Sequence, residues 1–96
     1  MVANENILKE KIDWTLFPNP ASDLVELQGT LPQSGNYEVT IYDVRGNNVL
    51  GKNMEVVNEQ FSITMNLQNL SNGVYVAVIR DEKGKKWGSQ TLEVVR

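Results

Sequence analysis

Apolar and polar residues alternate along most of this 96-residue chain. In the clearest run, residues 61–67, four apolar side chains alternate with small polar ones, as in a strand with one buried face and one solvated face. The same alternation recurs at residues 25–28, 37–41 and 91–94. Residues 74–79 are apolar on both faces, which indicates a central strand or a strand whose outer face is covered by a partner.

Short clusters of Pro, Gly, Asn and Asp separate these runs and predict turns. Neither Pro18 nor Pro20 can donate to a sheet ladder, so the first run ends there, and Gly46 and Gly73 fit turn positions where a Cβ is costly. The pattern predicts seven strands in a small antiparallel β-sandwich, with no helix and no internal repeat in the body of the chain. The predicted strands lie near residues 14–17, 24–28, 36–44, 47–56, 60–67, 73–81 and 86–95.

The length fits one domain, which we expect to span residues 14–96 after a linker or tail at residues 1–13. The N-terminal stretch lacks the apolar segment of about 7–15 residues that a secretory signal peptide needs. It therefore indicates either a cytosolic protein or a fragment of a longer chain. No apolar run approaches the roughly 20 residues that span a bilayer.

The charge distribution is uneven. The net charge of −3 argues against a nucleic-acid partner, which normally requires a basic face. Residues 1–79 contain four basic and nine acidic side chains, whereas residues 80–96 contain five basic and three acidic ones. The basic cluster is either a set of lysines that protects a sheet edge or a docking surface for an acidic partner. Its members are Arg80, Lys83, Lys85, Lys86 and Arg96.

Candidate chemistry is sparse. The absence of Cys and His excludes thiol and imidazole catalysis and the common zinc sites, and the carboxylates are scattered, so we predict no catalytic residue, metal or cofactor. Asp43, Asn47 and Asn48 offer oxygen ligands for calcium, but a turn in which Asp43 accepts backbone N–H groups is the favoured interpretation. The sequon at residues 69–71 also falls in a predicted turn. The aromatic residues could form a sugar-stacking platform but are more often core in so small a sandwich; they include Trp14, Trp87, Tyr37, Tyr42 and Tyr75.

Three segments occur in a characteristic order: LFPNPASD at 16–23, VTIYDVRG at 39–46 and LQNLSNGVYVAVI at 67–79. Together they resemble the C-terminal sorting domain of the type IX secretion system, found in one group of Gram-negative bacteria. The resemblance covers about residues 14–96 and implies an all-β, immunoglobulin-like sandwich. It implies structural roles for the motif residues Pro18, Asn19, Pro20, Asp43, Gly46, Gly73 and Tyr75.

The resemblance also implies a function as an address. Such a domain directs a covalently linked N-terminal cargo across the outer membrane to the cell surface or medium. The partners implied are outer-membrane translocon and shuttle proteins, together with a sortase-like surface peptidase that cuts within residues 1–13 or just upstream. The domain itself would have no enzymatic activity.

Recognition in such domains concentrates in about the last twenty residues. Here that region begins at Tyr75, and its candidate contact residues are Lys85, Lys86, Leu92, Glu93, Val94, Val95 and Arg96. Gln90 and Thr91 stand where such domains often carry a lysine, and Lys85 and Lys86 could supply that charge.

Other interpretations stay open from the sequence. The main alternative is an immunoglobulin-like accessory module of a surface protein that binds carbohydrate or protein. A small hydrolase with a carboxylate pair is more remote. A terminal edge strand could also pair or swap between two copies and form a homodimer.

Overall fold

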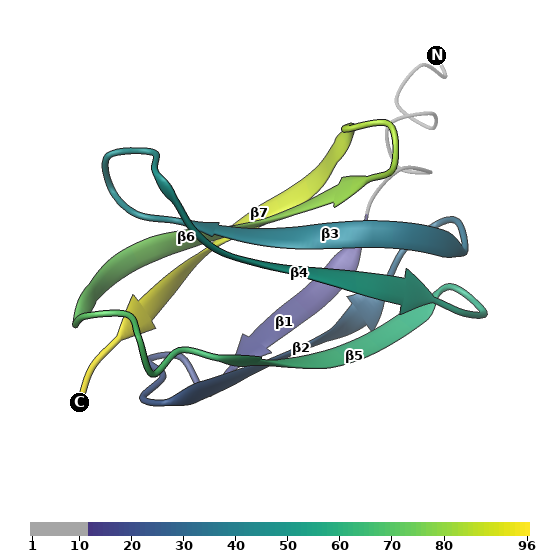
Figure 1. The fold of residues 1–96 in the computed structure, drawn as a ribbon. Coiled ribbons are helices and arrows are strands. Elements are labelled where there is room, and N and C mark those ends of the chain that lie inside the picture. The colour runs from purple at the N-terminus through teal and green to yellow at the C-terminus, as the bar shows by residue number, and fades with distance from the viewer. Residues whose placement is uncertain (1–11) are drawn as a thin grey trace, which may run out of the picture.

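The structure is a computed structural model that describes residues 12–96 (Figure 1). Its seven strands form two antiparallel sheets, one with the order β1-β2-β5 and the other with the order β4-β3-β6-β7. The strands are β1 (Asp13–Phe17), β2 (Leu24–Thr30), β3 (Gly35–Tyr42), β4 (Asn48–Val56), β5 (Gln60–Asn66), β6 (Gly73–Asp81) and β7 (Lys86–Val94). Figure 1 shows the two sheets stacked as layers. The predicted seven-stranded β-sandwich is confirmed.

The start of the sandwich differs slightly from the predicted domain boundary. Asp13 was expected in the tail, but it begins β1 and pairs with Thr30 of β2. Its backbone is therefore part of the sheet. The remainder of the predicted tail, residues 1–11, lies outside the described residues.

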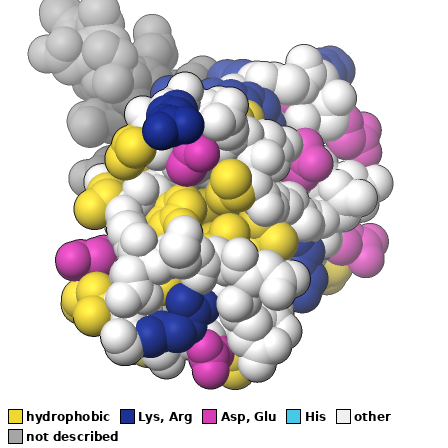
Figure 2. All heavy atoms as spheres, turned by 60° about the vertical axis from the view of Figure 1, so that its left-hand side comes forward, with side chains coloured by type: hydrophobic (Ala, Val, Ile, Leu, Met, Phe, Trp, Pro, Cys, Tyr) yellow, Lys and Arg dark blue, Asp and Glu magenta, His cyan; other side chains and the backbone are white. Residues whose placement is uncertain are grey.

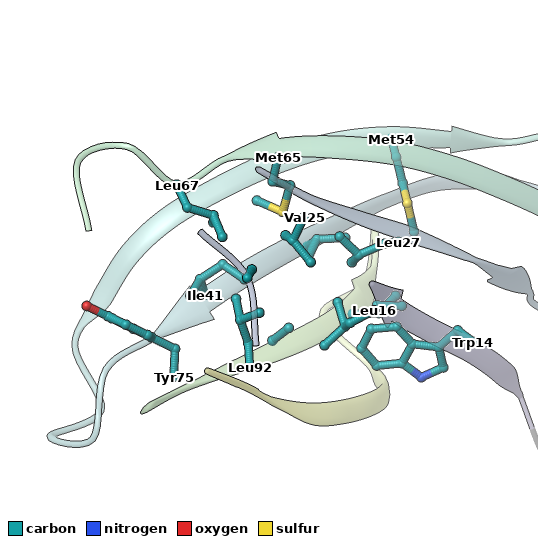
Figure 3. Packing of buried hydrophobic residues seen from close by; sticks show 14 of the residues in the cluster. Trp14, Leu16, Val25, Leu27, Ile41, Met54, Met65, Leu67, Tyr75 and Leu92 are labelled. Atoms are coloured by element: carbon teal, nitrogen blue, oxygen red, sulfur yellow. The ribbon is translucent and has the colours of Figure 1, made fainter. Parts of the chain in front are cut away.

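The core lies between the sheets and follows the alternation in the sequence. Residues of even number in β1 and odd number in β2 point inward, so Leu16 faces Leu27 across the strand pair. Ile41 of β3 and Leu92 of β7 reach the same space from the opposite sheet and are fully buried. Figure 3 shows these side chains meeting in the gap, with Trp14 towards one end and Tyr75 towards the other. Apolar burial of this kind is the main stabilising term for a sandwich without disulfides.

The four-stranded sheet contains an internal repeat that the sequence interpretation missed. Residues 35–46 and 73–84 share the pattern G-x-Y-x-x-x-I-x-D-x-x-G, and equivalent residues differ by 38 in number, as in 35 and 73. The first copy forms β3 and its turn into β4, and the second forms β6 and its turn into β7. Five identical positions separated by seven variable ones are hard to see in a chain dominated by period-2 alternation.

The register makes this repeat a pseudo-two-fold symmetry of the sheet. β3 and β6 lie side by side and antiparallel, and the pair Tyr37–Asp81 maps onto the pair of positions 75 and 43. Equivalent irregularities interrupt the ladders after Ile41 and after Ile79. Both tyrosines donate a hydrogen bond to a carbonyl four residues earlier, at 2.7 Å for Tyr37 and 2.6 Å for Tyr75. The two ends of the sheet are thus built on one scaffold with different surface residues.

A close approach between β1 and β2 makes Gly29 a packing requirement. A Cβ at Gly29 would lie 2.4 Å from both the Asp13 carbonyl oxygen and the Trp14 Cβ. At Gly51 of β4 the nearest atom would be the Glu38 carboxylate at 3.6 Å, an ordinary contact distance. Gly29 and Gly51 therefore provide a test position and a control, since both lie within strands but only Gly29 lacks room for a methyl group.

We predict that Gly29→Ala lowers the free energy of unfolding by about 1–3 kcal/mol or more, because β1 must shift to admit the methyl group. Gly51→Ala should change it by less than about 1 kcal/mol. Urea denaturation of both variants checks this. Equal stabilities would show that β1 yields to the methyl group at no cost.

Candidate recognition surface

Three loops and the residues after β7 gather at one end of the sandwich, on the left of Figure 1. They are the β1–β2 loop at residues 18–23, the β3–β4 turn at 43–47 and the β5–β6 loop at 67–72. Each contains part of one of the three segments singled out in the sequence. Segments far apart in the chain are therefore brought to one surface.

The β1–β2 loop completes the free edge of β7. The Ala21 amide donates to the Glu93 carbonyl at 2.8 Å, and the Val95 amide donates to the Ala21 carbonyl at 2.8 Å. The Asn19 side chain continues this pairing, since its Nδ2 donates to the Thr91 carbonyl and its Oδ1 accepts from the Glu93 amide, both at 3.0 Å. The Asn19 amide thus takes the place of a neighbouring strand, as no proline beside it could.

Arg96 connects the same edge to the β5–β6 loop. Its Nε donates to an Asp23 carboxylate oxygen at 2.8 Å, and its two terminal nitrogens donate to the carbonyls of Leu70 at 2.6 Å and Leu67 at 2.5 Å. Its backbone N–H donates to the Asn72 side chain at 3.2 Å. The planar guanidinium holds three acceptors from two loops, a geometry that a lysine ammonium cannot reproduce.

The third segment supplies buried side chains at this end of the sandwich. Leu70 is buried, and the Tyr75 hydroxyl is held by the Ser71 carbonyl. Between this loop and the β3–β4 turn lies a shallow hollow of about 440 Å³, with Asp43, Asn69 and Tyr75 among its lining residues. One predicted structural motif residue of the second segment, Asp43, and one of the third, Tyr75, therefore line the same depression.

Asp43 is a turn residue, as the favoured interpretation held. Its Oδ1 accepts the backbone N–H groups of Arg45 and Asn47, each at 2.9 Å, while Gly46 takes a left-handed φ of 86°. The hydrogen bonds from the Asn47 and Arg45 amides lower the pKa of the Asp43 carboxyl, against a smaller opposing effect of desolvation. Among residues 12–96 no cluster of three or more acidic side chains could hold a metal ion.

Lys85 and Lys86 lie at the other end of the sandwich, in the β6–β7 hairpin. Asp81 repeats the arrangement of Asp43 there: its Oδ1 accepts the amides of Lys83 and Lys85, and its Oδ2 accepts the Trp87 indole N–H at 3.0 Å. The Trp87 bond is the largest cause of the lowered pKa of the Asp81 carboxyl. The structure therefore does not bring the two lysines together with the other candidate contact residues.

The remaining predicted contact residues, 92–96, differ in whether their side chains point into the core or towards solvent. Leu92 and Val94 are fully buried, so their side chains belong to the core and cannot contact a partner of the folded domain. Glu93 between them and Val95 after them are exposed, and Arg96 keeps 30% of its side chain exposed. Side chains alternate along β7 up to its end at Val94, so Leu92 and Val94 point inward and Glu93 points outward, whereas Val95 and Arg96 follow the strand.

The proposed aromatic platform is absent from residues 12–96. Trp14, Tyr37 and Tyr75 are buried, and Trp87 is packed partly against the core. Tyr42 is half-buried, and its hydroxyl accepts a hydrogen bond from Arg80 at 2.7 Å. The described residues also contain no helix of the length and hydrophobicity required to span a membrane.

We predict that Arg96→Ala lowers the free energy of unfolding by about 1–3 kcal/mol, since two loop carbonyls lose a charged donor. Arg96→Lys should recover only part of this loss. Arg45→Ala, in the exposed β3–β4 turn, is the control and should change stability by no more than about 0.5 kcal/mol. Urea denaturation measures all three, and equal values for Arg96→Ala and Arg45→Ala would contradict the role of Arg96.

The two turn carboxylates give stability a pH dependence with a defined sign. Because folding lowers the pKa values of Asp43 and Asp81 below the ordinary 3.8, their contribution is present above about pH 4 and is lost as pH falls through the folded values. We predict a smaller loss of thermal stability between pH 6 and pH 3 in the double variant Asp43→Asn/Asp81→Asn. A loss equal to that of the unchanged protein would contradict this assignment.

Comparison with known proteins identifies the family. The family model described as the secretion system C-terminal sorting domain matches residues 15–91. No curated protein matches the chain. Among solved structures, the crystal structure of dimeric latent PorU from Porphyromonas gingivalis has a similar fold, with a TM-score of 0.71 and 23% sequence identity over 88% of this chain. The similarity covers only 9% of that chain, so it concerns one domain of a larger protein. With most of its length matched, the chain belongs to the family of type IX secretion C-terminal sorting domains, which mark proteins for export to the cell surface or medium.

Proposed function

We propose that the address carried by this domain is the folded end where the three motif segments meet. The observation that carries this proposal is a set of hydrogen bonds around the end of β7. Asn19 and Ala21 of the β1–β2 loop pair with this end, and Arg96, which follows it, bonds to the β5–β6 loop. A receptor that contacts this end meets residues from four parts of the chain at once. Among the predicted contact residues, Glu93, Val95 and Arg96 have accessible side chains there.

The partners follow from membership of the sorting family. We assign the outer-membrane translocon and its shuttle proteins as the receptors and a covalently linked N-terminal protein as the cargo. The sortase-like peptidase would cut within residues 1–13 or just upstream. The end of the sandwich formed by residues 18–23, 43–47, 67–72 and 95–96 is called the motif surface. Ile12 approaches Gly88 at the opposite end, so a cargo attached there leaves the motif surface accessible.

The domain would act as a substrate and not as an enzyme. The sorting family is not catalytic. Lys85 and Lys86 would serve a separate purpose at the cargo end, as exposed charges that discourage edge pairing with other chains. This role explains their distance from the motif surface without requiring a receptor contact.

The test is export of a periplasmic fluorescent reporter fused to residues 1–96, in a bacterium with this secretion system. We predict surface or medium fluorescence that disappears when the translocon gene is deleted. Retention of the folded fusion in the periplasm of the intact strain would contradict the proposed function.

Truncation of the last five residues is a poor variant for this purpose, because it removes the buried Leu92 and Val94 and would unfold the domain. Arg96→Ala is a more informative variant, provided that its free energy of unfolding is measured alongside its export. A variant that stays folded at the assay temperature and loses export identifies a defect in recognition.

A further inference from the structure

The outer face of the four-stranded sheet is apolar and uncovered near the motif surface. Val74 and Val76 of β6 are 47% and 37% exposed, and Val95, which follows β7, is 49% exposed. In the sheet register Val74 lies opposite Glu93. Val95 directly follows β7, and because its amide still pairs with the Ala21 carbonyl, the extended backbone continues and places Val95 on the same face as Glu93. These residues, Val74, Val76 and Val95, are the valine patch. Figure 2 turns the motif-bearing end of the molecule towards the viewer and shows hydrophobic side chains in the middle of that end, with basic and acidic groups above and below.

Farther along the same face, side chains of the sheet shield one another from solvent. Thr40 of β3 and Val78 of β6 are paired and are only 3% and 6% exposed. Tyr42 and Arg80 flank this row on opposite sides, and their side chains meet across it through a 2.7 Å hydrogen bond. Val76 is the cross-strand partner of Tyr42, but the Tyr42 hydroxyl bonds to Arg80 on the other side of the row, and both Val74 and Val76 keep their exposure.

The pseudo-two-fold symmetry shows that the scaffold does not require valines there. Positions 74 and 76 of β6 correspond to Asn36 and Glu38 of β3, which occupy the same outward sites on the other half of the sheet. The same backbone therefore accepts an amide and a carboxylate. At these two positions the half that carries the motif surface has valines, whereas Val95 has an exposed apolar equivalent, Val57, in the other half.

We propose that the valine patch is the docking face for a protein receptor of the secretion machinery, one with an apolar contact surface and a basic group opposite Glu93. This inference rests on the proposed function and extends it from the end of the sandwich onto the outer face of β6. The patch is continuous with the motif surface through Val95 and Glu93. It lies away from Ile12, where the preceding chain enters, so an attached cargo does not cover it.

Size and charge favour a receptor over other occupants. Three partly exposed valines fall far short of the roughly 800 Å² per partner of a standard stable interface, so a second copy would be held weakly. A receptor that must later release its cargo needs only a small face of this kind. An anionic lipid surface is disfavoured because Glu93 lies opposite Val74 and the neighbouring Arg96 is already paired with Asp23, whereas the lysines of the β6–β7 hairpin lie at the opposite end.

The test uses the reporter fused to residues 1–96 with Val74→Thr/Val76→Thr, which keeps the branched side chains that strands prefer. We expect export to fall about tenfold, as two methyl groups are lost from the contact, while thermal unfolding shows a folded domain. The control is Asn36→Thr/Glu38→Thr at the symmetry-equivalent positions, with export unchanged. Val57→Thr, equivalent to Val95 at the far end, is a second control.

The outcomes separate this inference from the proposed function. If the unchanged fusion is not exported, the proposed function fails. If it is exported and Val74→Thr/Val76→Thr is exported equally well, only the docking face is overturned. Equal losses in the control variants would also overturn it. A dimer in size-exclusion chromatography that the Val74→Thr/Val76→Thr variant abolishes would reassign the patch to a second copy. Binding to phosphatidylcholine–phosphatidylglycerol vesicles that this variant abolishes would reassign it to lipid.

Discussion

The free backbone edge of β7 is the constraint on which the rest of this surface depends. A sandwich of two open sheets leaves unpaired N–H and C=O groups along its outermost strands, and these groups need partners. On β1 and β5 one carbonyl each receives a side-chain donor: Gln90 donates to the Trp14 carbonyl and Lys52 to the Thr64 carbonyl. At β7 a whole segment does so, because Asn19 and Ala21 pair with the strand over its last residues. Satisfying this edge attaches the first motif segment to the end of β7.

The consequence for the proposed function is that a receptor at this end would contact a three-dimensional surface built from several segments. Arg96 bonds to Asp23 in the first loop and to Leu67 and Leu70 in the third, so a change in one segment alters the position of the others. A receptor that reads such a surface can distinguish a folded domain from an unfolded chain. This property suits a signal that must be presented outward while a cargo is attached at the opposite end.

Period-2 alternation predicted the strands well because each strand has a buried face, and a slip of one residue would expose it. It could not predict the role of Asn19, since the bonds to Thr91 and Glu93 link residues more than 70 positions apart. The predicted contact run 92–96 includes two residues, Leu92 and Val94, whose side chains alternate into the core, so the prediction now rests on Glu93, Val95 and Arg96. The repeat of G-x-Y and D-x-x-G was present in the sequence, and a search for self-similarity at fixed spacing would have found it.

The central claim is that the sorting signal is a folded surface and not a linear stretch at the end of the chain. The most direct measurement compares export of two reporters, one fused to residues 1–96 and one to residues 73–96 alone, which retain β6 and β7 but lack the β1–β2 and β5–β6 loops. The account predicts export of the first reporter and periplasmic retention of the second. Equal export of both would show that a linear signal suffices and would contradict the account.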